Sequence, residues 1–426
     1  RKPYPAEALV ASFKNMIVPK LEEKGLDYPA PYVHWTEKRN MQAFQELIAT
    51  KRIDLSYLTT HVFDFEDAPK AYDMIANRTE PYMGIVLKYD TNKVHKRQIV
   101  NISTAPTKLS DVGVAFIGAG SYAQSNLLPN LPNNIMRKCI MTNSGATSKR
   151  VAERFHFEAC TSDPKDILNN RDINTLFIAT RPDSHAKFVM AGLDAGKNVY
   201  VEKPLCLNIE ELENIKQLCV SKQKTVMIGF NRRFSPHAQE IKKKLGSGKM
   251  SMLYRINAGS IPADSWIQDM KVGGGRIIGE VCHFIDFMAY ICGSKPNKVI
   301  ASAMPDNQGL NDTVNIIVDF ENGSTGVVAY YANGSKALKK EYFEVYASGL
   351  TAIIEDFNKT TIYGKGKAVT FRTSSQNKGQ KEMIDKYISE IKKGNTLIPM
   401  DVIVAVTTAT FAVLKSIQED GAPVKF

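Results

Sequence analysis

The sequence VGVAFIGAGSYA, residues 112–123, joins an apolar run to a glycine-rich turn and decides the fold of the central part of the chain. Residues 112–117 have the composition of a strand buried inside a parallel sheet. The turn fits the pattern GxGxxG/A, in which the two glycines allow a tight turn and a close approach of the backbone to a pyrophosphate. We therefore predict a dinucleotide site at the start of the following helix. Its residues are Gly118, Ala119, Gly120, Ser121, Tyr122 and Ala123.

Strands and helices alternate on the carboxyl side of this turn. Apolar strands are expected near residues 139–142, 175–179, 198–201 and 225–228, and helices near 148–155, 185–195 and 209–222. This alternation predicts βαβ units and a doubly wound parallel sheet, which is a Rossmann domain. We place this domain at residues 111–231.

Strand-like alternation dominates after residue 232, between 253 and 356, and Asn-Gly pairs at 322–323 and 333–334 indicate turns. We expect an α/β domain at residues 232–426 with a large, mostly antiparallel open sheet. Two helices, near 380–392 and 401–418, end the chain, and they could pack back on the Rossmann domain.

The first quarter of the chain has a weaker pattern. Helices are expected near 37–50 and 68–76, and strands near 55–65 and 83–89. We interpret residues 1–90 as a short, partial α/β segment and the polar residues 91–110 as a linker.

Composition excludes several classes of protein. The 426 residues are 43% apolar and 23% charged, which is ordinary for a globular protein. The net charge of +11 is spread along the chain, so nucleic acid is not an expected partner. No apolar run approaches the roughly 18 residues of a membrane span. Six cysteines without a CxxC pair predict reduced thiols in a cytoplasmic protein and no metal site.

The ends of the expected parallel strands carry the next candidate residues, because ligands bind at that edge of such a sheet. The second strand is followed by Ser144 and Arg150 without an acidic residue, which slightly favours NADP over NAD; Arg150 could equally be a solvated helix residue. After the strand ending at 179, either a helix cap or cofactor contacts are expected. The candidate contacts there are Thr180, Arg181, Pro182 and His185.

Glu202 and Lys203 end the next strand, directly before Pro204. Both are candidate cofactor contacts. The fixed backbone at the proline would direct the Lys203 ammonium toward the crevice, where it could hold a substrate hydroxyl.

Five motifs occur in an order and at a spacing typical of one family. They are GAGSYA (118–123), ATRPDSHA (179–186), AGKNVYVEKPL (195–205), GFNRRFSP (229–236) and GGGRIIGEVCHFID (273–286). Residues 111–426 thereby resemble the glucose–fructose oxidoreductase / inositol dehydrogenase / MocA family. The resemblance implies hydride transfer between NAD or NADP and a hydroxyl or keto group of a sugar or nucleotide sugar, in surface-polysaccharide synthesis for example. It also implies a homo-oligomer, a dimer or a tetramer.

The resemblance assigns roles residue by residue. Lys203 is expected to be the catalytic lysine, and His283 the group that exchanges a proton with the reacting hydroxyl. Where the family has an aspartate, four residues before this histidine, the chain has Gly279, so Glu280 is a candidate replacement.

Three further residues are candidates for the substrate region. Asp286 could orient His283 or contact substrate, and Asn231 could contact substrate near the domain junction. For Arg233, contact with an anionic substrate and an interdomain salt bridge are equally plausible. Because the family's aspartate is missing, a dinucleotide-binding regulatory or catalytically impaired protein of the same fold stays an alternative.

Residues 25–75 are similar to the carboxyl-terminal end of a medium-chain, zinc-type alcohol dehydrogenase. We expect the Rossmann and zinc regions of that fold to be absent, so His34 and His61 are not expected to bind zinc. The combination resembles bi-domain bacterial oxidoreductases, and the chain would hold the second half and a remnant of the first. The helices of this remnant are expected to pack against the main body or a neighbouring chain.

Overall fold

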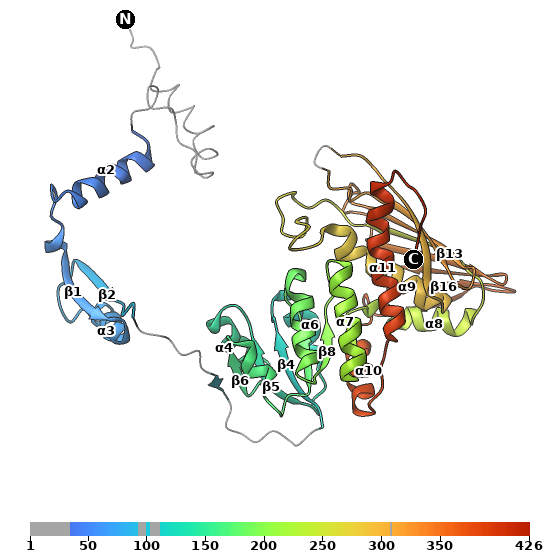
Figure 1. Ribbon diagram of the computed structural model, residues 1–426, viewed down its shortest axis with the longest axis horizontal. Helices are drawn as coiled ribbons and strands as arrows, with labels where there is room; N and C mark the ends of the chain where they lie inside the picture. Colours follow the sequence, from blue (N-terminus) through green and yellow to red (C-terminus); the bar gives the residue numbers. More distant parts are fainter. Residues whose placement is uncertain (1–34, 93–98, 103–110, 307–308) are drawn as a thin grey trace, which may run out of the picture. The chain divides into compact units, whose positions relative to one another are not determined.

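The computed structural model describes residues 35–92, 99–102, 111–306 and 309–426 (Figure 1). The chain divides into two compact units, residues 1–96 and 97–426, which are described separately. The first 34 positions, with His34, and positions 93–98 and 103–110 of the expected linker lie outside the described residues.

The first unit is a small α/β arrangement. Helix α2 (Glu37–Ala49), strand β1 (Thr59–Asp64), helix α3 (Ala68–Asn77) and strand β2 (Gly84–Lys88) follow one another, and β1 and β2 pair in parallel. This order confirms the expected helix–strand–helix–strand pattern. α2 has no buried residue, and its apolar side chains Met41, Phe44 and Ile48 are exposed.

A seven-stranded sheet forms the first layer of the second unit, in the order β3-β6-β5-β4-β7-β8-β9. The strands are β3 (Val100–Asn101), β4 (Gly113–Ile117), β5 (Met136–Met141), β6 (Ala159–Thr161), β7 (Thr175–Ile178), β8 (Asn198–Val201) and β9 (Val226–Ile228). All pairs are parallel except the antiparallel edge pair β3–β6. The doubly wound Rossmann sheet is therefore confirmed, and the buried apolar strands explain it, because helices cover both faces of such a sheet.

Helices α4 (Gly145–Arg154), α5 (Pro164–Leu168), α6 (His185–Asp194) and α7 (Ile209–Lys222) connect these strands. The helix after the glycine turn is short, with a π-helical turn at Ala123–Leu127 and a 3-10 turn at Leu128–Asn130. Helix α10 (Gln380–Lys392) reaches this sheet from the end of the chain, since the Tyr387 ring lies 5.8 Å from that of Tyr200 on β8.

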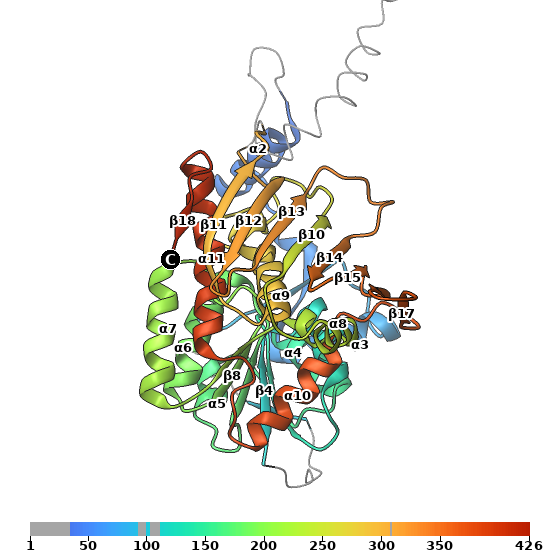
Figure 2. The same ribbon diagram turned by 90° about the vertical axis from the view of Figure 1, so that its right-hand side faces the viewer.

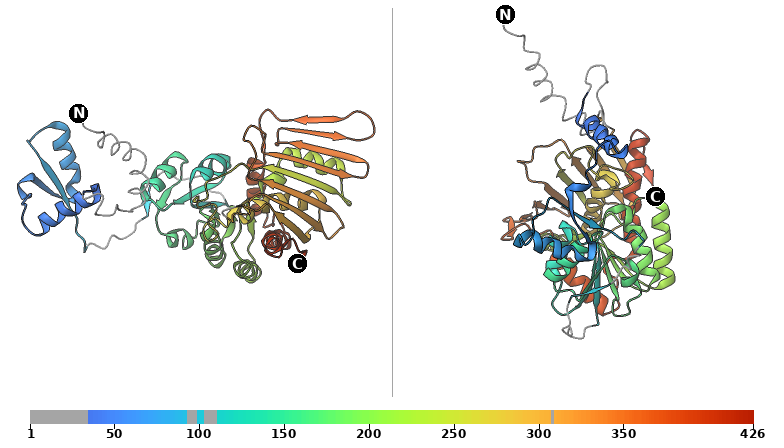
Figure 3. Two further views of the ribbon diagram at one scale, coloured as in Figure 1. Left: turned by 90° about the horizontal axis from the view of Figure 1, so that it is seen from above. Right: turned by 90° about the vertical axis from the view of Figure 1, so that its left-hand side faces the viewer.

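A nine-stranded sheet forms the remainder, in the order β17-β16-β15-β14-β10-β13-β12-β11-β18 (Figure 2). Its strands are β10 (Ser251–Asn257), β11 (Pro296–Ala303), β12 (Val314–Phe320), β13 (Thr325–Tyr331), β14 (Glu341–Ala347), β15 (Leu350–Glu355), β16 (Lys359–Tyr363), β17 (Val369–Arg372) and β18 (Val424–Lys425). Only β10 and β13 pair in parallel, which confirms a mostly antiparallel sheet. Helices α8 (Pro236–Leu245), α9 (Cys282–Cys292) and α11 (Met400–Gln418) pack against it, as the view from above also shows (Figure 3).

Helix α11 is the one described helix that is long and apolar enough to cross a membrane. It packs on β11 and α9, and its residues Ile403, Val406 and Val413 are buried there. This apolar composition is therefore what a helix in the core of a domain requires, and it gives only weak support for a membrane span.

Candidate active site

The glycine turn lies between the ends of β4 and β7. Gly118 has a φ of +88°, and a Cβ atom on it would lie 2.5 Å from the carbonyl oxygen of Ala179, so glycine is required there. A Cβ on Gly120 would meet no atom within 4 Å. Ala119 and Ala123 are buried, whereas Ser121 and Tyr122 are exposed. The turn thus offers open space at a helix start, which fits a pyrophosphate.

Two exposed polar residues, Ser144 and Arg150, follow β5 and could contact a ligand. Ser148 is buried and accepts a hydrogen bond from the Thr142 N–H at 2.8 Å, so this hydroxyl holds the loop. Ser144 is exposed at the N-cap of α4, and Arg150 is exposed in the middle of this helix.

The segment after β7 splits into exposed and buried residues. Arg181 is exposed, and its guanidinium lies 5.2 Å from the ring centroid of Trp266. Thr180 accepts from the Ser184 hydroxyl at 2.7 Å. Pro182 and His185 are buried, and the two ring nitrogens of His185 lie 2.7 Å and 3.1 Å from the carbonyl oxygens of Pro204 and Thr180. His185 therefore joins the loops after β7 and β8.

Lys203 and Glu202 lie at the end of β8. The Lys203 Nζ donates to the Gly279 carbonyl oxygen at 2.7 Å, which brings the end of the Rossmann sheet to the segment before α9. Glu202 is buried and accepts from the Tyr200 hydroxyl at 2.6 Å. Burial raises the pKa of Glu202 to about 7, although the Tyr200 hydrogen bond and the Lys203 charge oppose that rise.

His283 is buried in the first turn of α9, next to Phe230. Within the described residues its Nδ1 atom has no hydrogen-bond partner. Burial, together with the nearby cations of Arg232, Lys203, Lys340 and Lys378, holds its pKa well below the usual value. The imidazole is therefore neutral near pH 7 and has a free nitrogen for a proton.

The Glu280 carboxylate bonds Tyr330 and Lys340, and no bond to His283 is seen among the described residues. Its Oε2 accepts from the Tyr330 hydroxyl at 3.0 Å and from the Lys340 Nζ at 3.2 Å. Burial would raise its pKa, but the surrounding cations, of which Lys340 is the strongest, outweigh burial and hold the pKa at about 2. Glu280 therefore stays ionised near pH 7 and acts as a fixed charge.

Arg233 and Asp286 form a buried salt bridge. The Arg233 Nε donates to Asp286 Oδ2 at 3.0 Å, and the Arg233 Nη2 donates to Oδ1. Arg233 therefore forms a salt bridge, which was one of its two expected roles. Both Asp286 oxygens accept from Arg233, so Asp286 does not orient His283. Asn231 is also buried, and its side chain donates to the Lys378 carbonyl oxygen at 2.8 Å.

Sequence reasoning missed a second buried charge cluster beside His283. The Glu341 carboxylate accepts two bonds from Arg232, at 2.7 and 2.8 Å, one from the Tyr254 hydroxyl at 2.6 Å, and an ion pair from Lys378 at 2.7 Å. These residues lie as far as 146 positions apart in the sequence, from 232 to 378. Only the doubled arginine at 232–233 gave a local signal.

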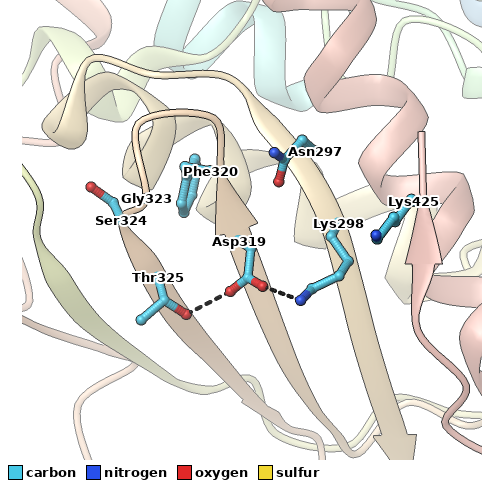
Figure 4. Close-up of a pocket in the computed structure, with 8 residues that line it drawn as sticks. All are labelled: Asn297, Lys298, Asp319, Phe320, Gly323, Ser324, Thr325 and Lys425. Carbon is cyan, nitrogen blue, oxygen red and sulfur yellow. Dashed lines mark hydrogen bonds and ion pairs between the residues drawn. The ribbon is translucent and has the colours of Figure 1, made fainter.

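The hollow drawn in Figure 4, of about 440 Å³, lies elsewhere. It is at one end of strands β11, β12 and β13, where Asp319 bonds Lys298 at 2.5 Å and Thr325 at 2.9 Å. None of the candidate residues lines it. In the part of the chain that the structure describes, no group of three or more His, Cys, Asp or Glu side chains is arranged to hold a metal.

Comparisons with known proteins agree with this arrangement. The family model described as "Oxidoreductase family, NAD-binding Rossmann fold" matches residues 112–230, and the model "GFO/IDH/MocA C-terminal domain" matches residues 241–352.

Among curated relatives, the uncharacterized oxidoreductase YrbE of Bacillus subtilis is 27% identical over 58% of this chain and 74% of its own length. Myo-inositol 2-dehydrogenase of Thermotoga maritima is 24% identical over 50% of this chain and 66% of its own length. The solved structure of levoglucosan dehydrogenase in complex with NADH and levoglucosan has a TM-score of 0.65 and 21% identity, and the match covers 74% of this chain and 99% of that one.

Proposed function

The chain belongs to the GFO/IDH/MocA family of oxidoreductases with an NAD-binding Rossmann fold, and on this premise we propose that it transfers a hydride between a nicotinamide and a carbon bearing a hydroxyl or keto group in a sugar or nucleotide sugar. The observation that carries the proposal is that the Lys203 Nζ bonds the Gly279 carbonyl oxygen, four residues before His283, whose buried Nδ1 has no partner among the described residues. Myo-inositol and levoglucosan dehydrogenases among the relatives support a sugar-like substrate.

The residues of the turn fit a dinucleotide. The positive φ at Gly118, the open space at Gly120 and the adjacent helix start offer backbone N–H groups to a pyrophosphate. When bound, the nicotinamide supplies or accepts the hydride. We assign further cofactor contacts to the half-buried Thr180, the exposed Arg181 and Lys203.

Lys203 and His283 divide the remaining chemistry. The Lys203 ammonium polarises the reacting oxygen, and the neutral His283 Nδ1 takes the hydroxyl proton when the sugar is oxidised and returns it in the reverse direction. Glu280 does not exchange this proton, because it is bound to Tyr330 and Lys340 and has a pKa of about 2. It acts by holding Lys340 in place.

Two substitutions test the assignment. We expect Lys203→Met and His283→Asn each to lower kcat by about 10²- to 10⁴-fold, because each removes a group that assists proton transfer. Reduced nicotinamide absorbance measures turnover on a panel of sugars, and fluorescence titration with NADH checks that cofactor binding persists for His283→Asn. Full activity of both variants contradicts the proposal.

One observation favours a second function, a dinucleotide-binding protein without turnover. Lys203 is held by a backbone carbonyl, that of Gly279, and no carboxylate is bonded to it in the described residues. Cofactor binding without a change in nicotinamide absorbance, on any sugar of the panel, favours this alternative.

We also propose a slight preference for NADP over NAD. Ser144 and Arg150 are exposed after β5 and are suited to a 2′-phosphate. We expect Arg150→Ala to weaken NADPH binding by roughly tenfold, since one charge-assisted bond is lost, and to leave NADH binding unchanged. Calorimetric titration measures both, and Lys149→Ala on the next residue is the control. Equal losses for the two cofactors count against a 2′-phosphate contact.

Several other features belong to the same proposal. We assign residues 111–231 to cofactor binding and 232–426 to substrate binding and homo-oligomer contacts, with no metal ion required. A cytoplasmic location is supported by the six cysteines, all free and buried.

We further propose that residues 1–90 derive from the end of an alcohol-dehydrogenase lobe. Its support is the α2–β1–α3–β2 order and the exposed apolar face of α2. An apolar face of this kind requires a cover, so hydrogen exchange in the full chain should show protection over 37–90; exchange at the unfolded rate there contradicts the assignment.

A further inference from the structure

Positive charge exceeds negative charge around His283. Cationic side chains arrive from both sheets and from the segments between them. They are Lys203, Arg232, Arg276, Lys340 and Lys378. The carboxylates paired with them are Glu280, Glu341 and Asp312.

The pairing within this group is uneven. Glu341 alone serves two cations, Arg232 and Lys378, at 2.7 Å each. Lys340 has Glu280 at 3.2 Å, and Arg276 has Asp312 only at 3.9 Å. Among the described residues, five cations stand against three paired carboxylates and the partly ionised Glu202, so between one and two positive charges are in excess.

Lys203 carries part of this excess charge. Its Nζ bonds the Gly279 carbonyl oxygen, which carries only a partial negative charge. The buried Glu202 precedes Lys203 in the chain. Because burial raises the pKa of Glu202 to about 7, its carboxyl is only partly ionised near neutral pH and only partly offsets the Lys203 charge. A buried excess of charge is costly unless something neutralises it.

The open side of the cluster is at Lys340. Its side chain is 39% exposed, whereas those of Arg232 and Glu341 are 9% and 1% exposed. One buried donor of the cluster, the Nε of Arg276, also has no hydrogen-bond partner among the described residues. The cluster is therefore built to receive a group that accepts hydrogen bonds and carries negative charge.

We propose that the sugar on which this protein acts carries a carboxylate or phosphate group close to the reacting hydroxyl, and that Lys340 selects it by binding this group. The inference rests on the proposed function and narrows its substrate class. It also supplies a physical benefit, because a negative charge next to His283 offsets the cations that disfavour its protonated form, and so strengthens the imidazole as a base.

Matched sugars test the proposal in the full chain with bound cofactor. The probes are the neutral, uronate and 6-phosphate forms of glucose, galactose and mannose, measured by calorimetric binding and by nicotinamide absorbance. We expect at least one charged form to bind roughly tenfold more tightly than its neutral partner. This advantage should shrink as salt rises from about 0.05 M to about 0.5 M, since ions screen the attraction. The uronate and phosphate arms distinguish the two sources of charge.

Three variants test whether Lys340 causes the tighter binding of the charged sugar. Lys340→Gln should remove most of the advantage of the charged sugar, and Lys340→Arg should restore much of it, because the positive charge returns. Lys339→Gln alters the exposed neighbouring lysine and should change nothing.

Two results overturn the inference: neutral sugars that bind as tightly as their charged partners, or no binding of any charged sugar. Turnover of neutral sugars alone would keep the proposed function and refute this inference. Tight binding of a charged sugar without turnover would support an anion site at Lys340 and contradict the proposed hydride transfer.

Discussion

Glu202 shows how burial sets the behaviour of a single residue in this protein. Its carboxyl lies against the Tyr200 hydroxyl, and a Cβ on Gly229 would lie only 2.7 Å from its Oε1. Such tight packing excludes water, so the protonated form is favoured and the pKa is about 7.

A stability measurement follows for Glu202→Gln. The folded-state pKa is raised, so its contribution to the free energy of unfolding is fully present below about pH 4.5 and is lost as pH rises toward about 7. The loss amounts to about 3 kcal/mol at ~1.4 kcal/mol per pH unit. Urea unfolding of both proteins at about pH 5 and about pH 8 isolates this term, because the difference in unfolding free energy between Glu202→Gln and the unaltered protein should change by about 3 kcal/mol between the two pH values.

The exposed Glu210→Gln is the matched control, and its pH dependence should follow that of the unaltered protein. An equal pH dependence in Glu202→Gln and the unaltered protein would show that the carboxyl is ionised throughout.

For single residues, the sequence identified some candidates but did not identify the partners of the charged ones. Lys203 and His283 were identified from motifs that contain them. The partners of Asp286 and Glu280 were not, because a carboxylate pairs with whichever cation the fold brings near, and these were Arg233, 53 positions away, and Lys340, 60 positions away.

At the scale of elements, the β4–turn–helix unit is the part most strongly determined by local sequence. Gly118 needs a positive φ and contacts the Ala179 backbone, whereas Gly120 borders open space. The two glycines therefore have different roles that substitution separates.

We expect Gly118→Ala to lower the free energy of unfolding by at least ~2 kcal/mol, through backbone strain and the overlap with Ala179. Gly120→Ala should keep the stability and weaken NADH binding, because its methyl group occupies the approach to the pyrophosphate. Urea unfolding and fluorescence titration measure the two effects. A Gly118→Ala protein as stable as the parent is incompatible with this geometry.

Pattern reasoning found many of the longer strands and helices, but it gave no range for helices α8 and α9 or for strand β16, and it missed several short strands. The edge strands β3, β17 and β18 have two to four residues, too few for a period to show. The helix after the glycine turn was expected, but its π-helical turn at Ala123–Leu127, which contacts α10, was not.

At the scale of the second unit, buried ion pairs connect the segment after the Rossmann sheet to the nine-stranded sheet and its helices. Arg232 and Arg233 leave the 3-10 turn Asn231–Phe234 in different directions, one to Glu341 on β14 and the other to Asp286 on α9. These pairs hold the turn that follows the seven-stranded sheet against the nine-stranded sheet and α9.

Removal of one partner should therefore be costly. We expect Arg233→Met to lower the free energy of unfolding by about 3–5 kcal/mol, because Asp286 is left buried without a cation. The double variant Arg233→Met/Asp286→Leu should recover much of this loss, as a double-mutant cycle by urea unfolding would measure. Independent, additive losses would mean that the two side chains do not act as a pair.

The doubly wound sheet, the glycine turn and the mostly antiparallel second sheet could be predicted from the sequence, because each depends on residues close together in the chain, where periodicity and turn chemistry act. Lys203 and His283 became candidates through motifs that resemble those of a known family. The tertiary structure sets the partners of the charged groups: Lys203 bonds the Gly279 carbonyl oxygen, Glu280 pairs with Lys340, and Arg232 pairs with Glu341. Electrostatic pairing depends on distance and burial in space, and residues far apart in sequence acquire these only when both sheets are packed together.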